Sequence, residues 1–152
     1  MFKNNSGLNS NLLTMFVTLV EFIGSIFIIY LITFTFGASL IESFYETFLF
    51  SMVISLECFM PIFVYCEHSN PFDLLNRLFI KKDYKSHMET ILVSIAYGGV
   101  IGAWFGALVI PLDWDRWWQN WPISCCIGSI MGSFLGGLFY TINFKNKAKQ
   151  HL

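Results

Sequence analysis

Four long apolar segments constrain this chain more than any other feature of its sequence. They cover residues 12–36, 47–65, 91–110 and 123–144, and each can cross a hydrocarbon layer about 30 Å thick as a helix. The 152 residues are 55% hydrophobic and only 12% charged, whereas a soluble domain has about 25% charged residues. The sequence therefore predicts an all-α membrane protein, in which residues 1–152 form one integral membrane domain built as a bundle of four transmembrane helices.

The basic residues lie almost entirely on one side of such a bundle. Four spans place the N-terminal tail, residues 66–90 and the C-terminal tail together, and these regions hold eight of the nine Lys and Arg residues. Only Arg116 lies on the other side. The positive-inside rule then predicts that both termini are cytosolic. The first apolar segment is far longer than a signal-peptide core, so we expect it to be retained as a span. A net charge of −1 gives no case for a nucleic-acid partner.

A short amphipathic helix is predicted on the membrane surface within the middle cytosolic loop. Asn70-Pro71 is typical of a helix start, and Phe72, Leu75 and Phe79 follow at helical spacing. In the second span, Pro61 is expected to kink the helix because it lacks a backbone N–H.

Six glycines predict close helix packing in the last two spans. They recur every four residues, about one helical turn, so each trio forms a smooth stripe that another backbone can approach. The stripes can pack against each other or against helices of another protein. Their members are Gly98, Gly102 and Gly106 in the third span, and Gly128, Gly132 and Gly136 in the fourth.

Glu21 and Glu57 are the two acids that fall near the middle of a predicted span. An intramembrane acid is a candidate for function because burying its charge is costly. One interpretation is a proton or cation path, which would make the chain a small transporter or lipid flippase. The other is a protonated carboxyl that is hydrogen-bonded to Ser or Thr, or to a partner protein's helix.

Residues 110–123, which we call the tryptophan loop, join the last two spans. Four of the five tryptophans lie here, and such clusters favour the boundary between lipid and water. Asp113, Asp115 and Arg116 could bind a metal or a phosphate, but no histidine or nucleophile lies near them. Asp113 and Arg116 could also pair across a turn begun by Pro111. The cysteines lack metal-ligand spacing, so we predict no metal, no cofactor and no catalytic residue.

Within this loop, P-L-D-W-D-R-x-W-Q-x-W-P-I closely resembles the signature of the PIG-F family of glycosylphosphatidylinositol (GPI) anchor biosynthesis proteins. The resemblance extends upstream over residues 102–107 and includes a second patch over residues 36–50. Trp117 stands where the family usually has proline, and family members usually carry further helices ahead of the matched part. The loop residues assigned by this match to partner or lipid contact are Pro111, Asp113, Trp114, Asp115, Arg116, Trp118, Gln119, Trp121 and Pro122.

The resemblance implies a function in the endoplasmic reticulum (ER) membrane. Family members are non-catalytic subunits that stabilise larger ethanolamine phosphate transferases of the PIG-O and PIG-G type. They thereby support addition of ethanolamine phosphate to mannose of the GPI precursor. The expected partners are such a transferase and membrane lipid, including the GPI precursor. In this interpretation Asp113 and Arg116 fix the loop, while Trp114, Trp118 and Trp121 anchor it at the luminal surface.

Overall fold

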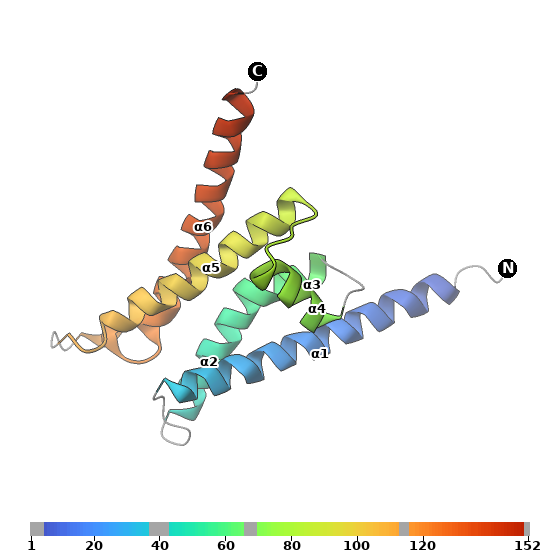
Figure 1. Cartoon of the computed structure of the whole chain (residues 1–152). Helices are drawn as coiled ribbons and strands as arrows, with labels where there is room; N and C mark the ends of the chain where they lie inside the picture. The colour runs from blue at the N-terminus through green and yellow to red at the C-terminus, as the bar shows by residue number, and fades with distance from the viewer. Residues whose placement is uncertain (1–4, 37–42, 66–69, 113–115, 151–152) are drawn as a thin grey trace.

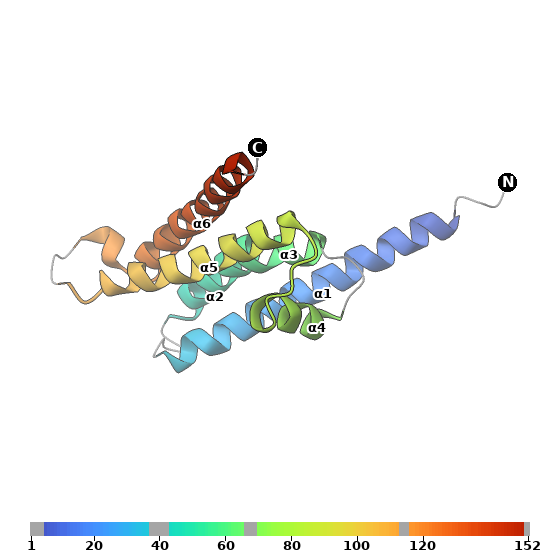
Figure 2. The same ribbon diagram turned by 45° about the horizontal axis from the view of Figure 1, so that its top comes forward.

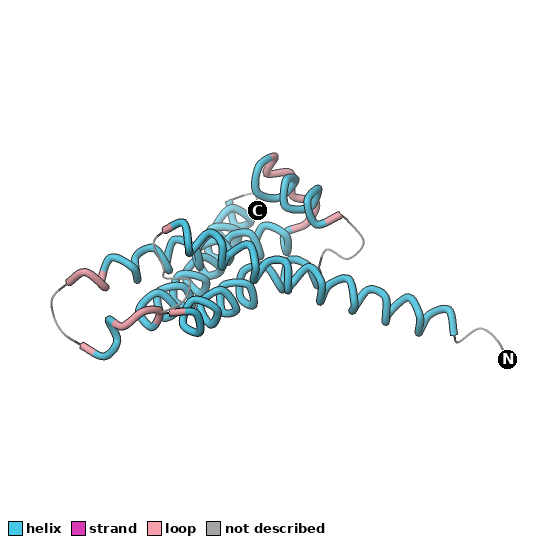
Figure 3. Tube along the Cα trace, turned by 90° about the horizontal axis from the view of Figure 1, so that it is seen from below, coloured by secondary structure: helices cyan, strands magenta, loops and turns pink. Residues whose placement is uncertain are grey.

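The computed structural model describes residues 5–36, 43–65, 70–112 and 116–150, and every regular element within these ranges is a helix (Figure 3). The main elements are α1 (Asn5–Thr35), α2 (Phe44–Ile54), α3 (Met60–Tyr65), α4 (Pro71–Leu75), α5 (His87–Leu108) and α6 (Ile123–Gln150). Two π-helical turns, η1 (Ser55–Phe59) and η2 (Asn76–Ile80), extend α2 and α4, and η3 (Trp117–Gln119) is a 3₁₀ turn.

Four stretches of helix are long and apolar enough to cross a membrane, which confirms the predicted fold class. They are Leu12–Thr35, Phe44–Tyr65, His87–Leu108 and Ile123–Asn143. The third begins four residues before the predicted boundary because Ser86 caps it. The Ser86 Oγ accepts a hydrogen bond from the Met88 N–H at 3.2 Å, so polar residues join the first turn of the helix.

The helices form two pairs that lie side by side. In Figure 1, α1 runs beside α2, and α5 crosses α6. The end of α1, the start of α2, the end of α5 and the start of α6 gather at one end of the molecule. Figure 2 shows α5 between α6 and the pair made by α1 and α2. The tryptophan loop and the start of α2 therefore lie at the same end.

The second span contains a π-helical turn directly before Pro61. Proline has no N–H to donate to the carbonyl four residues earlier, and its ring crowds that carbonyl. The chain inserts a wider turn here, in which the Met60 N–H bonds to the Ser55 carbonyl. Such turns relieve local conflict and change where side chains point.

The short helix α4, with η2, packs onto the bundle through two leucines that the sequence analysis did not single out. Leu74 and Leu78 are fully buried, whereas Phe72 is exposed. Phe79 lies beside the bundle, with its ring centroid 5.4 Å from that of Tyr97. Leu74 and Leu78 are four residues apart and share a helix face, so they hold this segment against the spans.

Candidate functional site

The glycine stripes of α5 and α6 face each other at the helix crossing. A methyl group added to Gly98 would overlap the carbonyl oxygen of Gly132, and the reverse substitution would overlap that of Gly98. Gly102 and Gly128 form a second reciprocal pair. Two more glycines extend the contact: Gly106 lies against Ser124 and Gly136 against Ser94. The two backbones meet directly, so only glycine fits at these positions.

Gln119 organises the described part of the tryptophan loop. Its side chain is buried, and its Nε2 donates to the carbonyl oxygens of Val109, at 3.0 Å, and Leu112. Its Oε1 accepts from the Arg116 N–H at 2.9 Å. One amide group thus joins both ends of the loop and satisfies backbone groups that no helix can pair.

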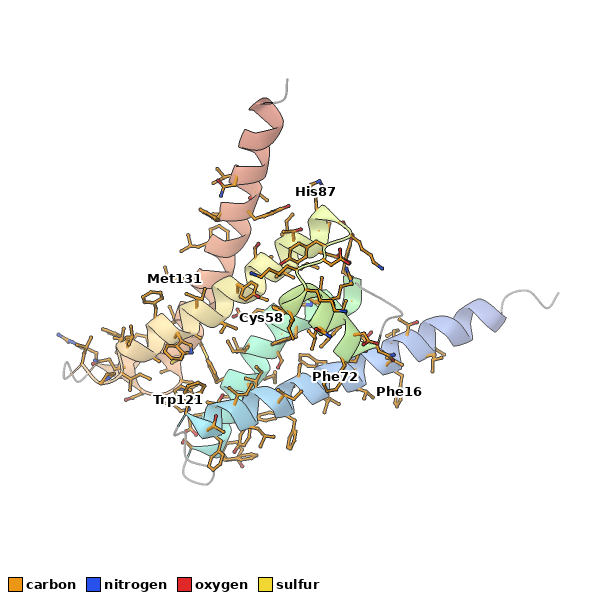
Figure 4. All side chains as sticks on the ribbon, viewed as in Figure 1. Phe16, Cys58, Phe72, His87, Trp121 and Met131 are labelled. Carbon is orange, nitrogen blue, oxygen red and sulfur yellow. The ribbon has the colours of Figure 1, made fainter. Side chains whose placement is uncertain are left out.

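Trp121 ties the loop to α2. Its indole N–H donates to the Thr47 Oγ1 at 3.3 Å, and its ring centroid lies 5.1 Å from that of Phe50. Figure 4 shows Trp121 at the loop end of the bundle, close to the α1 and α2 ends. The adjoining Trp121–Pro122 peptide bond is cis. This tryptophan therefore contacts the neighbouring helix pair instead of pointing away from the protein.

The other predicted loop residues fall into two groups. Pro111 and Arg116 are exposed, Trp118 is partly buried and Pro122 is buried. Trp117, which was not among the predicted contact residues, is also exposed. Asp113, Trp114 and Asp115 lie outside the described residues, and so does the expected pairing of Asp113 with Arg116.

Glu57 lies at a junction of three helices in the interior of the bundle. It occupies the π-helical turn η1, and its Oε1 accepts a hydrogen bond from the Ser129 hydroxyl of α6. The neighbouring Cys58 thiol donates to the Ala96 carbonyl of α5 at 3.8 Å. Figure 4 shows Cys58 at the centre of the molecule. Glu57 is itself partly exposed, as is Glu21 on α1.

Gly99 makes this junction possible, although the four-residue glycine pattern does not include it. A Cβ at this position would lie 2.7 Å from the Cys58 sulfur and 3.1 Å from Glu57 Oε1. It would also lie 2.5 Å from the Ser133 hydroxyl. The adjacent glycines at 98 and 99 could have indicated this junction. Gly98 contacts the α6 backbone, and Gly99 leaves room for polar side chains.

A buried ion pair at the opposite end of the molecule was also missed by the sequence analysis. Arg77 binds Glu89 through two hydrogen bonds, of 2.9 and 2.7 Å. Glu89 is 5% exposed and also accepts from the Lys85 N–H at 2.6 Å. A serine three residues before Glu89 matches the capping-box pattern, which could have identified this acid. The pair fixes η2 against the start of α5.

Comparison with known proteins identifies the family of this chain. The model of the family described as GPI biosynthesis protein family Pig-F matches residues 2–141. The chain belongs to this family. Family membership together with four apolar helices implies a protein of the ER membrane. No solved structure matches the chain.

Two Pig-F relatives illustrate the likeness. The GPI ethanolamine phosphate transferase, stabilizing subunit, of Homo sapiens is 38% identical over 117 residues, covering 77% of this chain and 52% of the relative. Glycosylphosphatidylinositol anchor biosynthesis protein 11 of Debaryomyces hansenii is 39% identical over 102 residues, covering 67% of this chain and 43% of the relative. The chain therefore spans about half the length of the curated relatives it matches.

Proposed function

We propose that this Pig-F chain is a non-catalytic subunit that binds and stabilises a larger GPI ethanolamine phosphate transferase in the ER membrane. In this role it supports the addition of ethanolamine phosphate to mannose of the GPI precursor. The human relative is named as a stabilizing subunit of that transferase, which supports the assignment. We further propose that the tryptophan loop faces the lumen, with both termini in the cytosol, because eight of nine basic residues belong to the opposite side.

The observation that carries the proposal is the preorganised hairpin of α5 and α6. Its helices meet backbone to backbone, and its loop is held by Gln119 and Trp121. Arg116 and Trp117 project from this fixed base and are exposed. Arg and Trp are the residues most enriched at the energetic centres of protein interfaces. A partner that binds such a surface loses little free energy in ordering it.

Co-purification in mild detergent tests this proposal. The chain is tagged and co-expressed with the transferase in cells that lack their own Pig-F protein. Gly102→Leu and Gly132→Leu should each remove most of the co-purifying transferase, because the new side chain separates α5 from α6. Gly24→Leu is the matched control, since a Cβ on Gly24 meets nothing within 4 Å, and it should leave the yield unchanged.

Trp117→Ala separates binding from folding in the same assay. Trp117 is 72% exposed, so its loss should lower the yield of transferase without changing the thermal stability of the purified chain. Wild-type amounts of transferase with both Gly102→Leu and Gly132→Leu present would refute the proposal.

A further inference from the structure

A cavity of about 370 Å³ lies between the two helix pairs, next to the tryptophan loop. Its walls come from all four spans, and Pro111 and Trp121 of the loop close one end. The deepest lining residues are Ile54, Ala103 and Cys125, which are 3%, 7% and 1% exposed. The volume falls within the range of about 300–1,000 Å³ that is typical of small-molecule sites.

The chemistry of the lining excludes water and polar ligands. Almost all of the wall is aliphatic or aromatic, and its hydroxyl and indole groups already have partners within the protein. The Thr33 hydroxyl donates to the Ile29 carbonyl at 2.7 Å, and the Trp121 indole N–H donates to Thr47. A water molecule needs two to four polar partners, so an apolar cavity of this kind accepts an apolar guest instead.

The edge of the cavity faces the surroundings of the bundle at membrane depth. Ile32 of α1, Phe36 directly after α1 and Trp104 of α5 form this edge and are exposed. The rings of Phe36 and Trp104 meet edge to face, with centroids 5.8 Å apart. These residues lie at the loop end of their spans, so a guest that enters between α1 and α5 comes from the lipid chains of one leaflet.

We propose that this cavity binds one hydrocarbon chain of a membrane lipid and thereby holds the lipid's head group beside the tryptophan loop. The site requires only the four spans and the loop of this chain, so it does not depend on the transferase partnership. It explains why the loop residue Trp121 turns inward to line an apolar space.

Photolabelling tests the proposal directly. The full chain is placed in phosphatidylcholine nanodiscs that contain a small fraction of phosphatidylcholine with a diazirine in one acyl chain. After photolysis, mass spectrometry locates the labelled residues. Ala103 and Cys125 should carry label, because a chain inside the cavity reaches them and lipid around the bundle does not. Label on exposed α6 residues such as Phe134, with none on Ala103 or Cys125, would overturn the proposal.

Two pairs of variants, one pair on α1 and one on α5, compare a substitution that fills the cavity with one outside it. Ile32→Trp and Val100→Trp place an indole at its partly exposed edge, where the residues are 45% and 42% exposed. Each should lower labelling of Cys125 roughly tenfold, as about 1.4 kcal/mol of lost binding would. Ile28→Trp and Ile101→Trp change residues of similar exposure, 51% and 54%, outside the cavity and should leave it unchanged. Equal losses in all four variants would contradict the site.

Competition identifies the lipid that supplies the chain. Unlabelled phosphatidylinositol and phosphatidylcholine with the same acyl chains are added to equal levels. Stronger protection of Cys125 by phosphatidylinositol would assign the site to an inositol lipid, the class of the GPI precursor. Equal protection would assign it to bulk phospholipid. If neither competitor reduces the label, the reversible binding proposed here is overturned.

Discussion

At the scale of single residues, Gln119 holds its loop because its side-chain amide both donates to and accepts from the loop backbone. Its amide joins Val109, Leu112 and Arg116. A loop that leaves a helix and returns to another has backbone groups that neither helix pairs. Burying one glutamine satisfies three of them and fixes the position of the exposed residues beside it.

Replacing Gln119 with alanine should lower the free energy of unfolding. The change removes three hydrogen bonds to the loop backbone, and each is worth about 0.5–1.5 kcal/mol. Thermal unfolding of the purified chain in detergent micelles measures the loss. Asn120→Ala, at the adjacent exposed position, is the control and should leave the midpoint unchanged. If the two variants unfold at the same temperature, Gln119 does not hold the loop.

At the scale of the elements, two glycine-dependent contacts hold the helices together in different ways. Along α5, Gly98 and Gly102 admit the backbone of α6, whereas Gly99 admits polar side chains from η1 and α6. In lipid there is no hydrophobic force between helices, so close packing and hydrogen bonds carry the association. The hydrogen bond from Ser129 to Glu57 links η1 to the hairpin through the space that Gly99 leaves.

The variant Gly99→Ala should separate these helices. Its methyl group would lie 2.7 Å from the Cys58 sulfur, and such overpacking typically costs about 1–3 kcal/mol. At Gly137 an added methyl meets only the flexible Ile95 side chain, at 3.2 Å, so Gly137→Ala is the control. Folded yield after detergent extraction should fall for Gly99→Ala and not for the control. The opposite order would exclude a junction at Gly99.

The fold was largely predictable because hydrophobic length is a local property of the sequence. The four-residue glycine spacing likewise indicated which face of each helix packs closely. The partners of Glu57 and Glu89 were not predictable, because Ser129 and Arg77 come from other elements and their approach depends on how the helices cross. For α4 and η2, the contact of Leu74 and Leu78 with the bundle was not predictable. The sequence pattern marks apolar positions, but whether lipid or protein covers each of them depends on how the segment docks.

For the whole molecule, the distribution of charge sets the orientation in the membrane. The helix ends alternate as four spans require, and the start of α5 lies at the opposite end from the loop that joins α5 to α6 (Figure 1). The positive-inside rule assigns the basic end to the cytosol. The proposed orientation would place the exposed Trp117 on the luminal side of the membrane.

Cysteine labelling of sealed ER microsomes should confirm this orientation. In a Cys66→Ser background, Lys81→Cys should react with a membrane-impermeant maleimide in intact vesicles. Trp117→Cys should react only after detergent opens them. Both positions are exposed, so a difference in their reactivity shows the side of the membrane on which each lies and does not arise from burial. Reaction of Trp117→Cys in intact vesicles would reverse the proposed topology.

The contact between Trp121 and Thr47 has a consequence for biosynthesis. Thr47 enters the membrane with the second span, whereas Trp121 emerges from the ribosome 74 residues later. Until then the Thr47 hydroxyl, which is fully buried in the finished protein, has no indole beside it. The contact therefore joins segments that are made at different times, and it is absent from every intermediate that ends before Trp121.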